Sequence, residues 1–217
     1  MSDRLIINYA DGVYAQDQPR LVKSCEALGL PIKCYGSRDR FTPHSVFPYY
    51  FKVDCLLDAA KYASILLWVD SAVVATGSGS VEPIFEHIEH YGYLLEKEDL
   101  FNSQYCNDAS LRAFGFTRDE ASKQHQVRGF FWGVDLLHPT GRFIIDELVR
   151  CKPLFKGRHT NEIRSESQDS RCLGHRHDQS VLSLLAAKRQ LHLPYWYEHN
   201  WCHYGQNLDY VFNELHR

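Results

Sequence analysis

Residues 65–71 read Ile-Leu-Leu-Trp-Val-Asp-Ser, and this stretch decides the fold class. Five apolar residues run directly into one carboxylate, that of Asp70. A continuous apolar run of this length, bounded by polar residues, is typical of a strand buried on both faces of a parallel sheet. An acidic residue at the end of such a strand lies at the carboxyl edge of the sheet, where open α/β folds bind ligands. Asp70 is therefore a candidate for a metal or phosphate site, although Asp is also favoured as the cap of a turn.

Strand and helix patterns alternate around this run up to about residue 95 and become mixed beyond it. The first half predicts further strands at 5–9, 31–35 and 93–95 and helices at 16–28, 49–62 and 81–91. The second half predicts short helices within 107–124, a strand at 126–135, helices at 141–151 and 178–191, and a long polar loop at 156–176. This order predicts an α/β fold, with a mixed, mainly parallel central sheet flanked by helices and a Rossmann-like N-terminal half. No linker-like change in composition occurs, so we expect a single domain over residues 1–217.

Composition excludes several classes of protein. The 217 residues are 44% hydrophobic and 13% aromatic, which is ample for a packed core. No run of about 20 apolar residues is present, so we expect no membrane span. A net charge of −3 argues against general affinity for nucleic acid. Seven cysteines without a CxxC motif, and an N-terminus without a secretory pattern, lead us to expect free thiols and a cytoplasmic location.

Two groups of residues besides Asp70 are candidates for chemistry. Lys52 lies on the helix before the Asp70 strand, where its ammonium can reach the same edge and neutralise a diphosphate; the alternative is an ordinary solvated lysine. Asp178 and Gln179 begin a predicted helix. Asp178 is either a helix cap or a general base for an acceptor hydroxyl, and Gln179 would then hydrogen-bond sugar or acceptor.

Three weaker signals complete the set. The turn Asn8-Tyr9-Ala10-Asp11-Gly12 follows the first strand and suits either a nucleobase pocket or a plain β–α turn. Gly129 and Gly133, inside the predicted strand at 126–135, indicate close approach by a ligand or another backbone. The late stretch 199–205 contains His199, Cys202 and His203, and imidazole is a common metal ligand. No GxGxxG, P-loop or GxSxG motif is present.

Taken in order, four stretches resemble the GT-A-fold glycosyltransferases, the nucleotide-diphospho-sugar transferases, and most closely the glycogenin and lipopolysaccharide galactosyltransferase type. The stretches are Asn8-Tyr9-Ala10-Asp11-Gly12; Tyr49-Tyr50-Phe51-Lys52 with Leu66-Leu67-Trp68-Val69-Asp70-Ser71-Ala72; His177-Asp178-Gln179-Ser180-Val181-Leu182; and His203-Tyr204-Gly205. They resemble the family's nucleotide pocket, its strand ending in an Asp-x-Asp metal motif, its acidic-Gln helix start and its late metal-binding histidine. The second aspartate of that motif falls at Ala72 here, and the family's basic-Pro-Trp ending is absent.

The resemblance implies a metal-dependent transferase that moves a hexose or deoxyhexose from a nucleotide diphosphate, with UDP favoured, to a hydroxyl of a glycan or glycoprotein. Residues 1–100 would then bind the nucleotide sugar, and residues 101–217 would bind the acceptor and complete the metal site. It implies donor binding by Asn8, Tyr9, Gly12, Lys52, Asp70 and Ser71, Mn²⁺ or Mg²⁺ held by Asp70 and His203, and catalytic roles for Lys52, Asp178 and Gln179.

Two other classes of protein remain open. Because Ala72 replaces an aspartate, the chain is alternatively an inactive module that binds a sugar nucleotide or glycan. The late histidines and cysteines suggest instead an interaction domain stabilised by zinc, although their spacing matches no known zinc module. The candidate zinc ligands are Cys172, His175, His177, Cys202 and His203.

Overall fold

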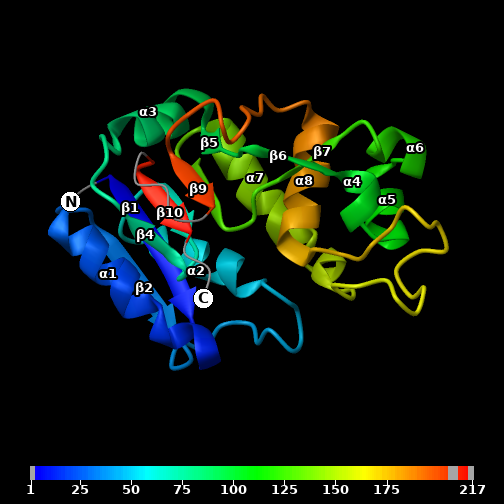
Figure 1. Ribbon diagram of the computed structural model, residues 1–217, viewed down its shortest axis with the longest axis horizontal. Helices are drawn as coiled ribbons and strands as arrows, with labels where there is room; N and C mark the ends of the chain where they lie inside the picture. The colour runs from blue at the N-terminus through cyan, green and yellow to red at the C-terminus, as the bar shows by residue number, and fades with distance from the viewer. Residues whose placement is uncertain (1–2, 205–209, 215–217) are drawn as a thin grey trace.

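The computed structural model describes residues 3–204 and 210–214, and its centre is a five-stranded mixed sheet in the order β2-β1-β3-β8-β5. β1 (Arg4–Ala10) pairs in parallel with β2 (Ile32–Gly36) and with β3 (Ile65–Val69). β8 (Phe131–Asp135) runs antiparallel to β3 and to β5 (Tyr93–Leu94). The predicted mixed α/β fold is therefore confirmed (Figure 1).

The strand that opens the sequence argument lies in the middle of this sheet. All five residues of β3 are buried, because neighbouring strands cover its edges and apolar side chains cover both faces. β1 and β3 end at the same edge, and the antiparallel β8 begins there, with Asp70 N–H donating to the Phe130 carbonyl at 2.9 Å. Three chain segments therefore meet immediately beyond Val69.

The predicted helices are present within a few residues of their expected bounds. Those in the first half are the 3₁₀ turn η1 (Gly12–Gln16), α1 (Gln18–Ala27), α2 (Phe51–Ala59) and α3 (Glu82–Tyr91). Those in the second half are α4 (Asn102–Tyr105), α5 (Asp108–Phe114), α6 (Arg118–Ala121), α7 (Pro139–Arg150), the 3₁₀ turn η2 (Lys152–Phe155) and α8 (His177–Arg189). Gly92 ends α3 with φ of 83°, a left-handed conformation that favours glycine.

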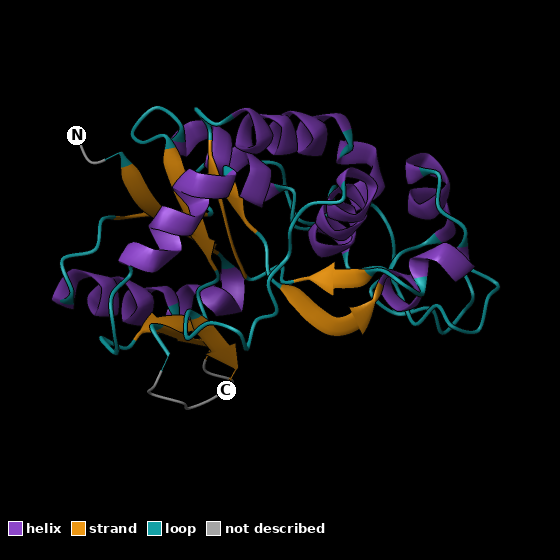
Figure 2. Cartoon of the chain, turned by 90° about the horizontal axis from the view of Figure 1, so that it is seen from above, coloured by secondary structure: helices purple, strands orange, loops and turns teal. Residues whose placement is uncertain are grey.

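The single strand predicted at 126–135 is wrong. It is two strands in different sheets: β7 (His125–Val127) pairs with β6 (Lys97–Phe101), and β8 belongs to the central sheet. Between them the backbone changes partners, because Arg128 N–H donates to the Glu96 carbonyl while the Phe130 carbonyl accepts from Asp70. Figure 2 shows β6 and β7 as a separate pair beside the central sheet.

A third sheet closes the carboxyl edge of the central one. β10 (Phe212–Glu214) lies between β4 (Val73–Ala75), which is antiparallel to it, and β9 (Cys202–Tyr204), which is parallel. The loop at 156–176 contains neither helix nor strand, as predicted. Across the described ranges, no helix combines the length and the apolar character needed to cross a bilayer.

Candidate functional site

A cavity of about 410 Å³ lies beyond the carboxyl ends of β1 and β3. Tyr9, Lys52, Asp70 and Ser71, four of the predicted site residues, line it. They come from β1, from the first turn of α2 and from the turn that follows β3. The cavity is therefore at the edge of the sheet where the sequence predicts a ligand.

Lys52 is a buried cation beneath this cavity, with 4% of its side chain exposed. Its Nζ lies 3.0 Å from Asp178 Oδ2 and 3.2 Å from Asp70 Oδ1, and it donates to the Gly129 carbonyl at 2.7 Å. Burial alone lowers the pKa of Lys52, but the charges of Asp178 and Asp70 outweigh burial, so the pKa is raised. An ammonium has three N–H donors, and each has a partner here. Lys52 therefore stays charged and fixes two carboxylates.

Asp70 is the more accessible of these two carboxylates, with 33% of its side chain exposed. Trp68 Nε1 donates to its Oδ1 at 2.6 Å, and this is the same oxygen that faces Lys52. The Asp70 carboxylate thus bonds to a ring and an ammonium, while the turn is closed by the Asp70 main-chain carbonyl accepting from Val73 N–H at 3.0 Å. This geometry favours the binding-site interpretation of Asp70 over the turn cap.

Asp178 lies in the first turn of α8 on the other side of Lys52, and only 8% of its side chain is exposed. Burial raises the pKa of Asp178, and the nearby Lys52 opposes that effect. The helix cap is Arg176, not Asp178. Gln179 points to a different neighbour, because its Nε2 donates to Glu98 Oε2 at 3.1 Å.

Comparison with known proteins bears on the fold of this arrangement. No protein-family model matches the chain, and no curated protein matches it in sequence. Among solved structures, the galactosyltransferase LgtC in complex with donor and acceptor sugar analogues is similar to it, with 13% identity and a TM-score of 0.52 over 97% of this chain and 86% of that one. An active-site mutant of LgtC gives the same coverage and TM-score at 11% identity. The chain has a GT-A-like fold.

A glycosyltransferase involved in glycosylation of the major capsid of PBCV-1 is also similar, at 16% identity and a TM-score of 0.40. The alignment covers 66% of this chain, which spans 65% of the length of that one. Identities this low establish the shared fold, and any activity has to be argued from the residues of this chain.

Within the GT-A-like fold, the first predicted donor residues divide into two kinds. Tyr9 lines the cavity, stacks on Phe51 with ring centroids 4.4 Å apart, and donates from its hydroxyl to Asp11 Oδ2 at 2.9 Å. Asn8 is fully buried: its Nδ2 donates to the Val69 carbonyl at 2.7 Å and its Oδ1 accepts from Gln18 at 2.7 Å. Asn8 thus ties β1 to β3, while Gly12 starts η1 with φ of 50°.

His203 lies on β9, and its ring contacts Trp196 and Tyr210, at centroid separations of 5.4 and 4.6 Å. It does not line the cavity that contains Asp70. In the β10–β9 register His203 is opposite Asn213, so its side chain and that of Glu214 leave the sheet on opposite faces. The structure therefore does not bring His203 and Asp70 into one cavity, and Gly205 of the same motif is outside the described residues.

The proposed zinc ligands are committed to other partners. His175 and His177 bond through ring nitrogens to the carbonyls of Leu154 and Phe155, each at 2.9 Å. All seven cysteines are free thiols. In residues 3–204 and 210–214, no three His, Cys, Asp or Glu side chains are grouped to hold a metal ion. This arrangement gives the zinc-stabilised interaction domain no support.

The sequence analysis missed Glu214, a carboxylate on β10 that lines the same cavity as Asp70. Burial, and then the charge of Asp70, raise the pKa of Glu214 to about 7. Its Oε2 is buried and has no hydrogen-bond partner in the described part of the chain. No motif in the sequence marks this residue, because it lies in a short strand outside any periodic pattern.

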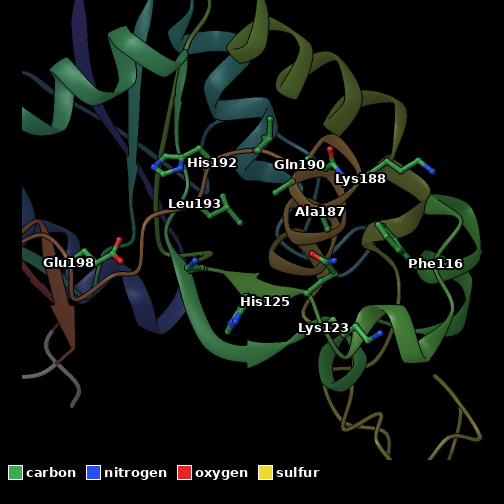
Figure 3. A pocket seen from close by; sticks show the side chains of 13 residues that line it. Phe116, Lys123, His125, Ala187, Lys188, Gln190, His192, Leu193 and Glu198 are labelled. Carbon is green, nitrogen blue, oxygen red and sulfur yellow. The ribbon is translucent and has the colours of Figure 1, made fainter.

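A second hollow, of about 690 Å³, lies at the C-terminal end of α8 and beside β7 (Figure 3). Lys97, Lys123 and Lys188 line it, together with His125 and Glu198. None of the predicted site residues is among its lining residues. Its volume exceeds that of the Asp70 cavity, but the buried charges and the sheet edge favour the smaller cavity as the reactive one.

Proposed function

We propose that this protein transfers a hexose or deoxyhexose from a nucleotide diphosphate donor, UDP being favoured, to a hydroxyl group of a glycan or glycoprotein. The observation that carries the proposal is one cavity at the carboxyl edge of a GT-A-like sheet, where Asp70 is exposed above a buried Lys52. Tyr9 and Ser71 line the same cavity. An aromatic face, a hydroxyl and a carboxylate suit a nucleotide whose phosphates carry a cation.

Asp70 would hold a divalent cation, Mn²⁺ or Mg²⁺, against the donor diphosphate. One oxygen of its carboxylate is fixed by Lys52 and Trp68, and its exposed fraction is large enough for a hard cation to reach it. When bound, such a cation stabilises the negative charge of the departing nucleotide diphosphate. His203 as a second ligand stays a prediction.

Lys52 would act through its field. Because all its donors are used, it orients Asp70 and Asp178 and keeps a positive charge beneath the cavity. A fixed charge of this kind favours the departure of an anionic leaving group without reorganisation.

Asp178 would accept the acceptor proton if the reaction inverts the anomeric centre. If the configuration is retained, Asp178 and Gln179 would position the substrate instead. Burial raises the pKa of Asp178, which brings a carboxylate closer to the range useful for a general base. The anomeric configuration of the product, determined by NMR, separates the two roles.

Calorimetry tests the metal and nucleotide parts of the proposal. UDP should bind more tightly with Mn²⁺ than with EDTA, and Asp70→Asn should remove that difference. Asp99→Asn, an exposed carboxylate on β6, is the matched control and should keep it. Equal UDP affinity with and without Mn²⁺ in the unmodified protein would refute metal-dependent donor binding.

A sugar-nucleotide-binding module without catalytic activity is the second candidate, and the observation that favours it is Ala72, which lines the cavity without offering an oxygen ligand from its side chain. Release of UDP from a UDP-sugar at a rate that depends on Asp178 would exclude it. Tight binding of UDP-sugars without turnover, across a panel of sugars and acceptors, would support it.

A further inference from the structure

The wall of the Asp70 cavity contains a carboxylate from the C-terminal strand of the described chain. Glu214 and Asp70 both line this cavity, together with Ala72. The inference below concerns how a cation would be held there, and it rests on the proposed metal-dependent transfer.

The strand register explains why Glu214 reaches the cavity. β10 runs antiparallel to β4, with Glu214 opposite Val73. Val73 directly follows Ala72, and its N–H closes the turn on the Asp70 carbonyl at 3.0 Å. Glu214 therefore stands across from the turn that contains Asp70, Ser71 and Ala72, beside the position at which an Asp-x-Asp motif would have its second carboxylate.

The bonding of the two carboxylates differs in a way that suits a shared cation. Asp70 is fixed through Oδ1 by Lys52 and Trp68. Oε2 of Glu214 is buried and accepts no hydrogen bond from the described residues. A buried carboxylate oxygen without a donor is destabilising, and a hard divalent cation is the kind of partner that compensates for it.

His203 has the opposite placement. It is paired with Asn213 on β10, one residue before Glu214, and strand alternation directs the two side chains to opposite faces. Its ring packs against Trp196 and Tyr210. Of the two C-terminal candidates, only Glu214 lines the cavity with Asp70.

We propose that Glu214 and Asp70 form a carboxylate pair that binds the divalent cation, with Glu214 supplying from β10 the carboxylate that Ala72 does not provide. The remaining positions on the cation would be taken by water and by diphosphate oxygens of the donor. The metal site would thus be assembled from two strands that are adjacent in space but distant in the sequence.

The test compares UDP affinity in Mn²⁺ with UDP affinity in EDTA, measured by calorimetry on purified variants. Glu214→Gln keeps the shape of the side chain and removes its charge, so it should reduce the Mn²⁺-dependent gain in UDP affinity by about 10- to 100-fold, the effect expected for one fewer charged ligand. Glu86→Gln, an exposed glutamate on α3, is the matched control and should retain the full gain.

A rescue variant makes the test independent of folding defects. In the Glu214→Gln background, Ala72→Asp should restore Mn²⁺ dependence, because it returns a carboxylate to the same cavity. Thermal unfolding of each variant monitors folding, and Glu214→Asp, which keeps the charge on a shorter side chain, should give an intermediate gain.

The outcomes separate this inference from the function on which it rests. Loss of Mn²⁺ dependence in Asp70→Asn but not in Glu214→Gln would overturn the role of Glu214 alone. Loss in His203→Gln with full dependence in Glu214→Gln would overturn it in favour of the histidine. No Mn²⁺ dependence in the unmodified protein would overturn both the pair and the proposed metal-dependent function.

Discussion

Two buried cations stand on either side of one short connection, and they are built differently. Arg128 and Gly129 are consecutive residues between β7 and β8. The Arg128 side chain forms an ion pair with Glu96 at 3.3 Å, and both side chains are 0% exposed. The Gly129 carbonyl instead accepts from Lys52, whose partner Asp70 is 33% exposed. One ion pair is sealed, and the other opens into a cavity.

The difference shows what each cluster is for. Arg128 also donates to the Cys202 carbonyl at 2.7 Å and lies over the Phe130 and Trp196 rings, so it fastens β9 to the junction between the sheets. Lys52 holds carboxylates that ligands and water can approach. We therefore expect changes at Arg128 to act mainly on folding, and changes at Lys52 to act on folding and on donor binding together.

The largest expected effect comes from breaking the sealed cluster with Arg128→Met. Removal of one partner from a buried ion pair costs about 3–5 kcal/mol in the free energy of unfolding. Here the substitution also removes the hydrogen bond to the Cys202 carbonyl. Urea denaturation measures the loss. Arg150→Met, whose ion pair with Glu147 is on the surface, should change stability little, and an equally small effect at Arg128 would contradict the comparison.

Lys52→Met should destabilise the protein less than Arg128→Met, by about 2–3 kcal/mol, because water can solvate Asp70 once the ammonium is gone. The same change should weaken UDP binding in Mn²⁺ by at least about 10-fold, since Asp70 and Asp178 would then repel each other and lose their fixed positions. Denaturation and calorimetry on one preparation give both values. The exposed pair of Lys61 with Asp58 supplies the control, Lys61→Met, which should leave UDP binding unchanged.

The open cluster was the more predictable of the two from sequence. The apolar run before Asp70 predicts a buried strand and its ligand-binding edge, because both follow from the local pattern. Lys52 and Asp178 were recognised singly, but their contact through one ammonium depends on how α2 and α8 pack.

The remaining features depend on tertiary structure that no local pattern encodes. The Gly129 carbonyl is a main-chain acceptor and leaves no mark in the sequence. The strand predicted at 126–135 failed for the same reason: its residues look continuous, and the change of sheet at Arg128 is set by the partner strands. Glu214 and the Arg128–Glu96 pair also required the fold to be known.

The pH dependence of stability sharpens the contrast through Glu96. Burial raises the pKa of Glu96 to about 8, against the opposing effect of Arg128. Between the ordinary glutamate pKa and this value the folded protein keeps a proton that the unfolded chain has lost, so stability falls as the pH rises. The slope is at most about 1.4 kcal/mol per pH unit. Glu96→Gln should flatten it between about pH 5 and pH 8 in chemical denaturation, and an unchanged slope would mean that Glu96 ionises normally.

The smallest expected effect probes the connection between the two clusters. Gly129→Ala would place a Cβ 3.2 Å from Gln179 Cβ and 3.5 Å from Asp178 Oδ2. The first separation is tight, so α8 or the connection must shift by a few tenths of an ångström, at a cost in stability of about 1 kcal/mol. Since Asp178 lies at that contact and Glu96 does not, the shift should lower the turnover of sugar donor several-fold and leave the pH dependence assigned to Glu96 unchanged. Donor turnover and pH-dependent denaturation measure the two sides separately. If Gly129→Ala altered both equally, the two cation clusters would form one coupled unit instead of a sealed anchor beside an open site.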